Sequence, residues 1–314
     1  MNLKVEELSK TFGTKKAVDR ISFSMDRPGV FGLIGTNGAG KTTTIRMMLG
    51  IIEKDSGSAE WNGKPISRET MSFGYMPEER GIYTKTKVMD QLIYFGQLRG
   101  MSHGDAKKSA LVWMDRLGVS EYKDMVAEKV SKGNQQKIQL LATLIHNPDL
   151  VVLDEPFSGL DPVNTELIRK LISELVEDGK YIVMSSHQMS TVEEFCENLV
   201  MLHNGETILS GNLKQIKAGY GHTNLVVRAS KDVASIALET GLELLAHRAD
   251  ETEYKIEGDD MAEAFLSKMI ATGEYPIKYE IREPSLHEIF LEKAALPMAA
   301  PMGVPMAIQK GVRI

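Results

Sequence analysis

The sequence is poor in the features that mark secreted, membrane-spanning and nucleic-acid-binding proteins. Cys196 is the only cysteine among 314 residues, which excludes a disulfide framework and a cysteine-based zinc site. No window approaches the roughly 18 continuous apolar residues that a membrane helix needs, and the N-terminus lacks the apolar core of a signal peptide. The net charge is −6 and no basic run is visible, so no nucleic acid is expected as a partner. The composition therefore predicts a soluble, cytoplasmic protein.

A glycine-rich stretch stands out against this background. Gly35–Thr42, reading G-T-N-G-A-G-K-T, fits the phosphate-binding pattern G-x-x-x-x-G-K-[ST] at every fixed position. The apolar segment 29–34 before it predicts a buried strand, and the segment 42–50 after it has helical spacing. Such a unit lets backbone N–H groups converge on an anion at a helix N-terminus. A glycine-rich turn that binds nothing is the alternative, and both flanks argue against it.

We therefore expect this stretch to bind the phosphates of a nucleotide. Lys41 would reach the terminal phosphates, and the Thr42 hydroxyl would hold Mg²⁺. The residues expected to contact the nucleotide here are Gly35, Thr36, Asn37, Gly38, Ala39, Gly40, Lys41, Thr42 and Thr43.

Two adjacent carboxylates indicate which reaction the predicted nucleotide site could carry out. Asp154 and Glu155 follow the apolar run Leu150–Leu153, which predicts a buried parallel strand with acidic groups at its C-terminal edge. Nucleotide hydrolysis needs an oxygen ligand for Mg²⁺ and a group that orients or deprotonates the attacking water. Either residue alone could be an acid in a turn. In a chain with a phosphate loop, the pair indicates catalysis.

The remaining chain predicts further structural parts. Helical periodicity indicates a helical segment at residues 86–130. Asp161 before Pro162 is typical of a helix N-cap. Gly219–His222 resembles a linker. Beyond it we expect a small two-layer α+β domain of βαββαβ order, followed by a helix with a capping box from Ser285. Its predicted elements are strand 224–229, helix 231–240, strands 243–247 and 252–257, helix 260–271 and strand 275–281. The Pro-Met repeats of residues 295–314 predict a disordered tail.

Taken in order, the motifs resemble those of the ATP-binding subunits of ABC transporters over residues 1 to about 218. Ser131–Gln136, reading S-K-G-N-Q-Q, resembles the family's signature S-G-G-Q-Q. Ser158–Asp161 resembles its S-x-L-D loop, and His187 resembles its switch histidine. The resemblance implies an α/β fold: a P-loop NTPase core of the ABC ATPase type with a helical subdomain at about 86–130. The C-terminal α+β domain would cover residues 222–294.

The resemblance also implies a role for each matching residue near the nucleotide. Phe12 would stack on adenine, and Lys41 would bind the β- and γ-phosphates of ATP. Thr42 and Asp154 would hold Mg²⁺. Glu78 stands where the family has Gln, and its carboxylate can still ligate Mg²⁺ because that ion prefers hard oxygen donors.

Catalytic and coupling roles follow from the same resemblance. Glu155 would be the general base, His187 would contact the γ-phosphate, and Asp161 would couple two sites across a dimer. The signature residues implied to meet the nucleotide are Ser131, Gly133 and Asn134. Lys132 stands where Gly is usual and Asn134 where Gln is usual. These variants and the closing segment 284–291 resemble a subgroup of bacterial exporters similar to sodium-extruding ATPase subunits.

One phosphate loop and one signature imply that two working sites need two chains. We expect a homodimer or heterodimer that closes on ATP and passes its motion to a separate membrane permease near residues 86–130. The chain would then be peripheral on the inner face of the cell membrane, with residues 222–314 stabilising the dimer. One alternative is a soluble ATPase acting on ribosomes or DNA, and another is a regulatory ATP-binding protein with little hydrolysis. Membrane association and phosphate release would distinguish the three.

Overall fold

The computed structural model describes residues 2–67, 69–79, 81–248 and 250–294, so the predicted tail at 295–314 lies outside the described residues. The chain divides into two compact units, the first ending at Leu213 and the second beginning at Lys214. Each unit has a hydrophobic core of its own. Among the described residues, none of the helices combines the length and the apolar content that crossing a bilayer requires.

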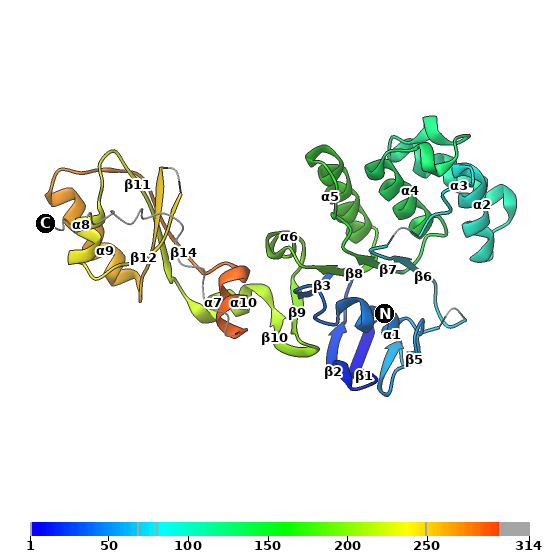
Figure 1. Cartoon of the computed structure of the whole chain (residues 1–314), viewed down its shortest axis with the longest axis horizontal. Helices are drawn as coiled ribbons and strands as arrows, with labels where there is room; N and C mark the ends of the chain where they lie inside the picture. Colours follow the sequence, from blue (N-terminus) through cyan, green and yellow to red (C-terminus); the bar gives the residue numbers. More distant parts are fainter. Residues whose placement is uncertain (1, 68, 80, 249, 295–314) are drawn as a thin grey trace, which may run out of the picture. The chain divides into compact units, whose positions relative to one another are not determined.

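A six-stranded sheet of order β10-β9-β3-β8-β7-β6 forms the centre of the first unit (Figure 1). β10 pairs antiparallel with β9, and the other five strands are parallel. The strands are β3 (Gly29–Gly35), β6 (Phe73–Met76), β7 (Leu150–Asp154), β8 (Tyr181–Ser186), β9 (Asn198–His203) and β10 (Glu206–Asn212). Because β3, β7 and β8 are parallel, their carboxyl ends meet at one edge of the sheet, where ligands of such sheets bind.

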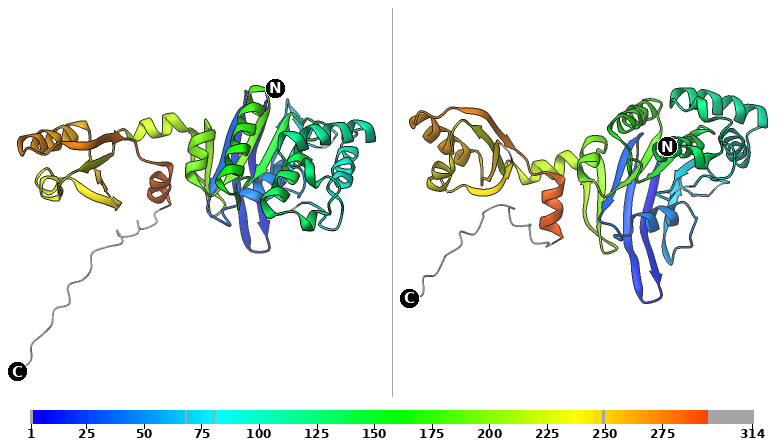
Figure 2. Two further views of the ribbon diagram at one scale, coloured as in Figure 1. Left: turned by 90° about the horizontal axis from the view of Figure 1, so that it is seen from above. Right: turned by 45° about the horizontal axis from the view of Figure 1, so that its top comes forward.

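A second, antiparallel sheet packs with α1 (Lys41–Met48) around the core of this unit. Its order is β2-β1-β4-β5. Its strands are β1 (Leu3–Phe12), β2 (Lys15–Met25), β4 (Ser56–Trp61) and β5 (Lys64–Pro65), with β1 and β2 drawn in blue as a long hairpin (Figure 2). Phe23 of β2 stacks on Phe31 of β3 with ring centroids 4.6 Å apart. Phe12 is the last residue of β1 and pairs with Lys15 of β2.

The predicted change to helix after residue 86 is confirmed. This segment holds α2 (Val88–Leu98), α3 (His103–Arg116), η1 (Ser120–Tyr122) and η2 (Ala127–Lys129), and α4 (Lys132–Leu144) follows it. Ala106, Ala110 and Met114 recur every fourth residue of α3 and are fully buried, as a helix packed on one face requires. A Cβ at Gly96 of α2 would lie 2.7 Å from the Ala106 Cβ, so glycine permits the close approach of these two helices.

Two further helices complete the first unit. α5 (Pro162–Glu177) begins as predicted, because the Asp161 side chain accepts a hydrogen bond of 2.9 Å from the Asn164 N–H. α6 (Met189–Phe195) is a short helix that the sequence pattern did not indicate.

The second unit has the predicted βαββαβ order, confirmed by its secondary structure. The sheet order is β12-β13-β11-β14, and α8 and α9 pack on one face through a core that includes Phe265 and Tyr254 (Figure 1). Its elements are α7 (Leu213–Tyr220), β11 (Asn224–Ala229), α8 (Ala234–Glu239), β12 (Glu243–Arg248), β13 (Glu251–Lys255), α9 (Asp259–Ala271), β14 (Pro276–Arg282) and α10 (Leu286–Lys293).

The linker expected at Gly219–His222 is wrong in part. Gly219 lies inside α7, and only the next glycine, Gly221, has a helix-breaking φ of +69°.

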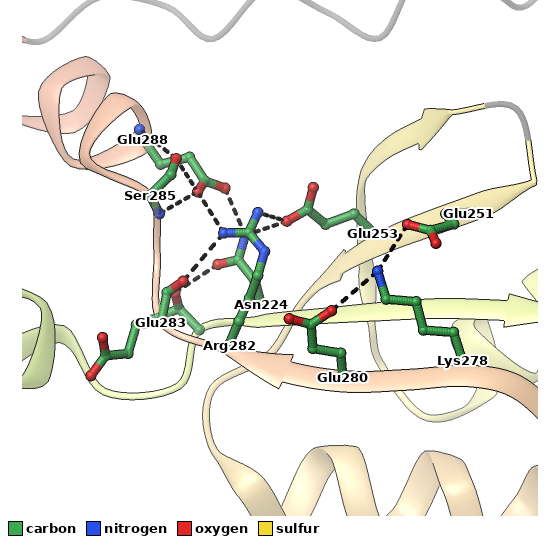
Figure 3. A network of polar contacts seen from close by, with 10 residues as sticks. Asn224, Glu251, Glu253, Lys278, Glu280, Arg282, Glu283, Ser285 and Glu288 are labelled. Atoms are coloured by element: carbon green, nitrogen blue, oxygen red, sulfur yellow. Dashed lines mark hydrogen bonds and ion pairs between the residues drawn. The ribbon is translucent and has the colours of Figure 1, made fainter. Parts of the chain in front are cut away.

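A polar network holds α10 to the other face of this sheet (Figure 3). The Asn224 amide donates to Glu253 at 2.8 Å and to Glu288 at 2.6 Å, and Arg282 pairs with both glutamates. Ser285 and Glu288 form the predicted capping box. Burial would raise the pKa of Glu288, but the hydrogen bonds from Ser285 and Asn224 and the charge of Arg282 outweigh it, so the pKa is lowered.

Candidate functional site

The glycine-rich stretch forms the predicted strand–loop–helix unit. Gly35 ends β3, the loop follows, and α1 begins at Lys41. Gly40 has a φ of +104°, and a Cβ there would lie 2.6 Å from the Ala17 carbonyl oxygen. Only glycine therefore fits this position. Ala39 is buried, and its N–H donates to the Thr36 carbonyl at 3.1 Å, which closes the turn.

Lys41 joins the loop to the carboxylates at the end of β7. Its side chain is buried, and its Nζ donates to the carbonyl oxygens of Gly35 at 2.8 Å and Thr36 at 3.3 Å. The same Nζ lies 3.5 Å from Glu155 Oε1. The ammonium is thus placed between the phosphate loop and a strand-end carboxylate, where an added anionic group would be attracted.

Three hydroxyl groups surround Asp154, which is 1% exposed. Thr42 Oγ1 donates to Asp154 Oδ2 at 2.9 Å, Ser185 Oγ donates to Oδ1, and the Tyr75 hydroxyl lies 3.5 Å from Oδ2. Burial, together with the Asp154 charge, raises the pKa of Tyr75 to about 12. These contacts fix the orientation of the carboxylate.

The residues around Asp154 fit a magnesium ion bound together with phosphates. Thr42 and Asp154 present hard oxygen donors side by side. No group of three or more His, Cys, Asp or Glu residues in the described ranges could hold a metal by itself. Mg²⁺ is commonly bound through one or two carboxylates plus the phosphates of a substrate, so a site of few protein ligands suits it.

Glu155 lies next to Asp154 in a strained backbone conformation. It is 5% exposed and has a φ of +54°, which is uncommon outside glycine. Its N–H donates to the Ser185 carbonyl at 3.2 Å, and His187 Nδ1 lies 2.8 Å from its Oε1. The structure therefore brings the predicted base and the predicted switch histidine into direct contact. Backbone strain of this kind persists only where surrounding contacts enforce it.

Two adjoining hollows share Glu78. One is a groove of about 480 Å³ whose lining includes Phe12, Asn37, Gly38, Lys41, Thr42, Thr43 and Glu78. The other is a cavity of about 290 Å³ whose lining includes Glu78, Lys132, Asp154 and Glu155. The Phe12 side chain is 52% exposed, so its ring is accessible for stacking. The structure thus gathers the predicted adenine, phosphate, metal and base residues at one edge of the sheet.

The signature residues are placed differently. Ser131 is the N-cap residue of α4, is exposed, and makes no capping hydrogen bond with its side chain. The Asn134 amide donates to the Tyr122 hydroxyl at 3.0 Å, and a Cβ at Gly133 would lie 3.3 Å from Asn164 Nδ2. In the part of the chain that is described, none of these three signature residues belongs to the lining of the Phe12–Lys41 groove.

Asp161 is an exposed helix cap in this structure. Hydrogen bonds from the Asn164 N–H and side chain lower the pKa of Asp161. The capping interpretation is therefore confirmed, and a coupling role between two chains would use the same exposed carboxylate.

The sequence did not reveal Tyr75 and Ser185 as partners of Asp154. Ser185 is the next-to-last residue of the buried strand β8 and stands two residues before His187. A polar residue at the end of a buried parallel strand is the signal that could have identified it.

Comparison with known proteins gives this site a family context. Residues 18–158 match the family model described as ABC transporter. Residues 211–294 match the model described as the C-terminal domain of DrrA1-3-like ATP-binding proteins.

Individual relatives agree with these matches. The chain is 41% identical over 292 residues to the ABC transporter ATP-binding protein YhaQ of Bacillus subtilis (strain 168), covering 93% of this chain and 98% of that protein. It is 31% identical over 302 residues to the linearmycin resistance ATP-binding protein LnrL of the same organism, covering 92% and 97%. A solved ATP-binding subunit of an ABC transporter is 28% identical, with a TM-score of 0.64, over 70% of this chain and 94% of that one.

Proposed function

This chain belongs to the family of ABC transporter ATP-binding proteins, and from that premise we propose that it powers export through a separate membrane permease. The family's ATPase domain hydrolyses ATP, and its ATP-binding subunits dimerise and work with permeases. The resistance named for LnrL is consistent with export.

The ATP-hydrolysing part of this proposal rests on the contact between the phosphate loop and the strand-end carboxylates. Lys41 Nζ lies 3.5 Å from Glu155, and the Thr42 hydroxyl donates to Asp154 at 2.9 Å. Lys41 would bind the β- and γ-phosphates of ATP. Glu155 would take a proton from the attacking water, and His187, 2.8 Å from Glu155, would orient that carboxylate and contact the γ-phosphate.

Mg²⁺, when bound, would neutralise charge that develops on the phosphates. Thr42 and Asp154 would hold it, and Glu78 would add a carboxylate from the loop after β6. Ser185 and Tyr75 would keep Asp154 in the orientation that ligation needs, because both hydroxyls lie at hydrogen-bonding distance from its carboxylate.

The exposed signature supports a dimer. Ser131 caps α4 without using its hydroxyl, and this side chain and the helix N-terminus are available to the phosphates bound by a second chain. Asp161 would contact the second chain from the neighbouring loop. We propose that two chains, identical or different, close as ATP binds and separate after hydrolysis.

A surface on the helical segment suits the permease. A cavity of about 220 Å³ lies between the loop after β6, α2 and α4, and its lining includes Ile82, Phe95 and Leu98. Tyr83 and Tyr94 stand beside it, 52% and 46% exposed, and Tyr83 stacks on Phe95 with centroids 5.7 Å apart. Exposed aromatic and aliphatic side chains around a hollow are typical of a protein–protein contact. Docking there would place the chain on the inner face of the membrane.

The second unit would stabilise the dimer. Its position directly after the ATPase unit motivates this proposal, and its core and polar network give it an independent fold. Deletion of residues 222–314 should weaken ATP-dependent dimer formation, as followed by size-exclusion chromatography. An unchanged dimer would contradict this role.

Replacement of the proposed base tests the catalytic part. Glu155→Gln keeps the shape of the side chain, so ATP should still bind, but hydrolysis should fall by about 10²–10⁴-fold because general-base assistance is lost. The variant should accumulate as an ATP-bound dimer. The exposed Glu177→Gln is the control and should hydrolyse ATP like the parent. A Glu155→Gln chain with the parent's rate would show that Glu155 is not the base.

Purification of the tagged chain from detergent-solubilised native membranes tests the partner. A multi-span membrane protein should come with it, and Tyr94→Glu should reduce the recovery by placing a charge in the aromatic contact. Leu111→Glu on α3 is the matched control, because Leu111 is 43% exposed outside the cavity lining. Recovery of ribosomal or DNA-repair proteins without a permease would overturn the exporter proposal.

A further inference from the structure

Helix α4 contacts both loops that carry the proposed catalytic and metal-binding carboxylates. The Gln136 amide donates to the Pro156 carbonyl at 2.7 Å. One turn further along, the Gln139 amide donates to the Pro77 carbonyl at 2.7 Å and to the Glu79 carbonyl at 3.1 Å. Residues three apart share one face of a helix. The two glutamines therefore form a single contact face of α4 toward the nucleotide site.

Each glutamine fixes the backbone next to a functional carboxylate. Pro156 follows Glu155 directly, and the Glu155 backbone has a φ of +54° that needs external support. Pro77 and Glu79 flank Glu78 on both sides. Both glutamines also belong to the lining of the cavity that contains Glu78, Asp154 and Glu155. The contacts thus join α4 to the two positions where small displacements would affect chemistry.

The same helix begins with the signature. Ser131 caps α4, and Gly133 packs against Asn164 so closely that a Cβ would lie 3.3 Å from its side-chain nitrogen. The N-terminus of α4 would therefore face the nucleotide of a second chain, while Gln136 and Gln139 hold the carboxylate loops of their own chain. Nothing in the signature resemblance assigns a function to Gln139.

We propose that Gln136 and Gln139 are positioning residues that couple the two ATP sites of a dimer. When the signature of α4 engages the nucleotide of the partner, the displacement of α4 is passed through Gln136 to the loop of Glu155 and through Gln139 to the loop of Glu78. This inference rests on the proposed dimeric ATPase and explains how occupation of one site sets the geometry of the other.

Two variants test the Gln136 and Gln139 contacts separately. Gln136→Met and Gln139→Met keep the length of the side chain and remove the N–H donor. We expect Gln136→Met to lower kcat by about 10–100-fold with little change in KM for ATP, because groups that orient catalytic residues affect rates by this factor. Gln139→Met should instead raise the Mg²⁺ concentration for half-maximal hydrolysis by about 10-fold, since it frees the Glu78 loop.

A buried glutamine outside the signature provides the matched control. Gln91 of α2 is 1% exposed, and its amide donates at 3.4 Å to the carbonyls of Tyr83 and Thr86, away from both carboxylate loops. Gln91→Met loses the same kind of hydrogen bond to the main chain at a residue that does not line the nucleotide site. Its kcat and Mg²⁺ dependence should stay within about twofold of the parent, as expected where only a main-chain contact of modest net strength is lost.

Hydrogen exchange gives a readout that does not depend on turnover. In full-length chains carrying Glu155→Gln, added ATP and Mg²⁺ should protect the amides of residues 76–79 and 154–160. Gln136→Met should remove protection at 154–160 only, and Gln139→Met at 76–79 only, while the ATP-bound dimer still forms. If both variants behave like Gln91→Met in kinetics and in exchange, the inference is wrong.

The unmodified chain tests the proposed function independently of the glutamine variants. A parent chain that neither hydrolyses ATP nor dimerises with it contradicts the proposed function. Even then, faster exchange at 154–160 in Gln136→Met and at 76–79 in Gln139→Met, measured without nucleotide, would support the positioning contacts. Equal exchange in all three glutamine variants would overturn them.

Discussion

Charged residues converge at one sheet edge in the first unit and pair with one another across a sheet face and α10 in the second. Lys41, Asp154 and Glu155 are at most 6% exposed and contact one another's loops at the carboxyl ends of parallel strands. In the second unit, Arg282 pairs with Glu253 and Glu288, and Lys278 pairs with Glu251 and Glu280 (Figure 3). The charged groups of the first unit face the two adjoining hollows. Those of the second unit are paired with one another.

The contrast between the two units indicates where chemistry is expected in this chain. A buried Lys–Glu pair is costly to desolvate, and because this one lies beside a cavity and a strained backbone, a function is expected there. The partly exposed ion pairs of the antiparallel sheet contribute modestly to stability and need no ligand. Substitutions in the first unit should therefore change binding or rate, and substitutions in the second should change its stability.

The largest expected effect is on the core of the second unit. Phe265 is fully buried between α9 and the sheet and contacts Tyr254. Phe265→Ala should lower the free energy of unfolding of this unit by about 3–5 kcal/mol, the usual cost of such a cavity. Calorimetry should show this transition move to lower temperature while that of the ATPase unit stays. The milder Phe265→Leu is the control, and one common transition would contradict the division into independently stable units.

Much of this organisation could be predicted from the sequence because it depends on local patterns. The strand–loop–helix unit around Lys41 and the cap at Asp161 are fixed by residues close together in the chain, and both predictions are confirmed. The linker prediction was wrong at Gly219 because a glycine can also adopt helical φ and ψ, as this one does near the end of α7. Short α6 left no periodic signal long enough to detect.

The contacts around the carboxylates could not be predicted in this way. Thr42 and Asp154 are separated by 112 positions in the sequence, and Ser185 reaches Asp154 only because β7 and β8 are neighbours in the sheet. The order β3-β8-β7 differs from the order in the chain. The contacts of Gln136 and Gln139 are likewise invisible in the sequence, because the loops after β6 and β7 reach α4 only in the folded chain.

A second prediction concerns the buried lysine of the first unit. Lys41→Ala removes the ammonium that donates to the loop carbonyls and should weaken ATP binding by about 100-fold, equivalent to about 2.7 kcal/mol. Equilibrium titration with a fluorescent ATP analogue measures this. Lys15→Ala is the control, because Lys15 lines the same groove but is exposed. An affinity within twofold of the parent would contradict the role of Lys41.

The smallest effect is expected for the network that holds α10. Glu288→Gln keeps the shape of the side chain but removes its charge toward Arg282, and it replaces by an NH2 donor one of the two oxygens that accept from Ser285 and Asn224. Hydrogen bonds to charged groups contribute about 1.5–3 kcal/mol, so the second unit should be destabilised by an amount at the lower end of this range, measured by urea unfolding. ATP affinity should not change. Glu292→Gln, at an exposed position of α10, is the control.

The same carboxylate makes the stability of the second unit depend on pH in a defined direction. Because the folded pKa of Glu288 lies below its ordinary value of 4.5, the folded state holds its proton less tightly than the unfolded state. The stabilisation is therefore complete above pH 4.5 and is lost as the pH falls from there through the folded pKa. Urea unfolding between pH 7 and pH 3 should show the parent losing its advantage over Glu288→Gln in this acidic window. A constant difference between the two chains would mean that the charge of Glu288 does not stabilise the network, and that α10 is held by its apolar contacts through Leu286, Ile289 and Phe290.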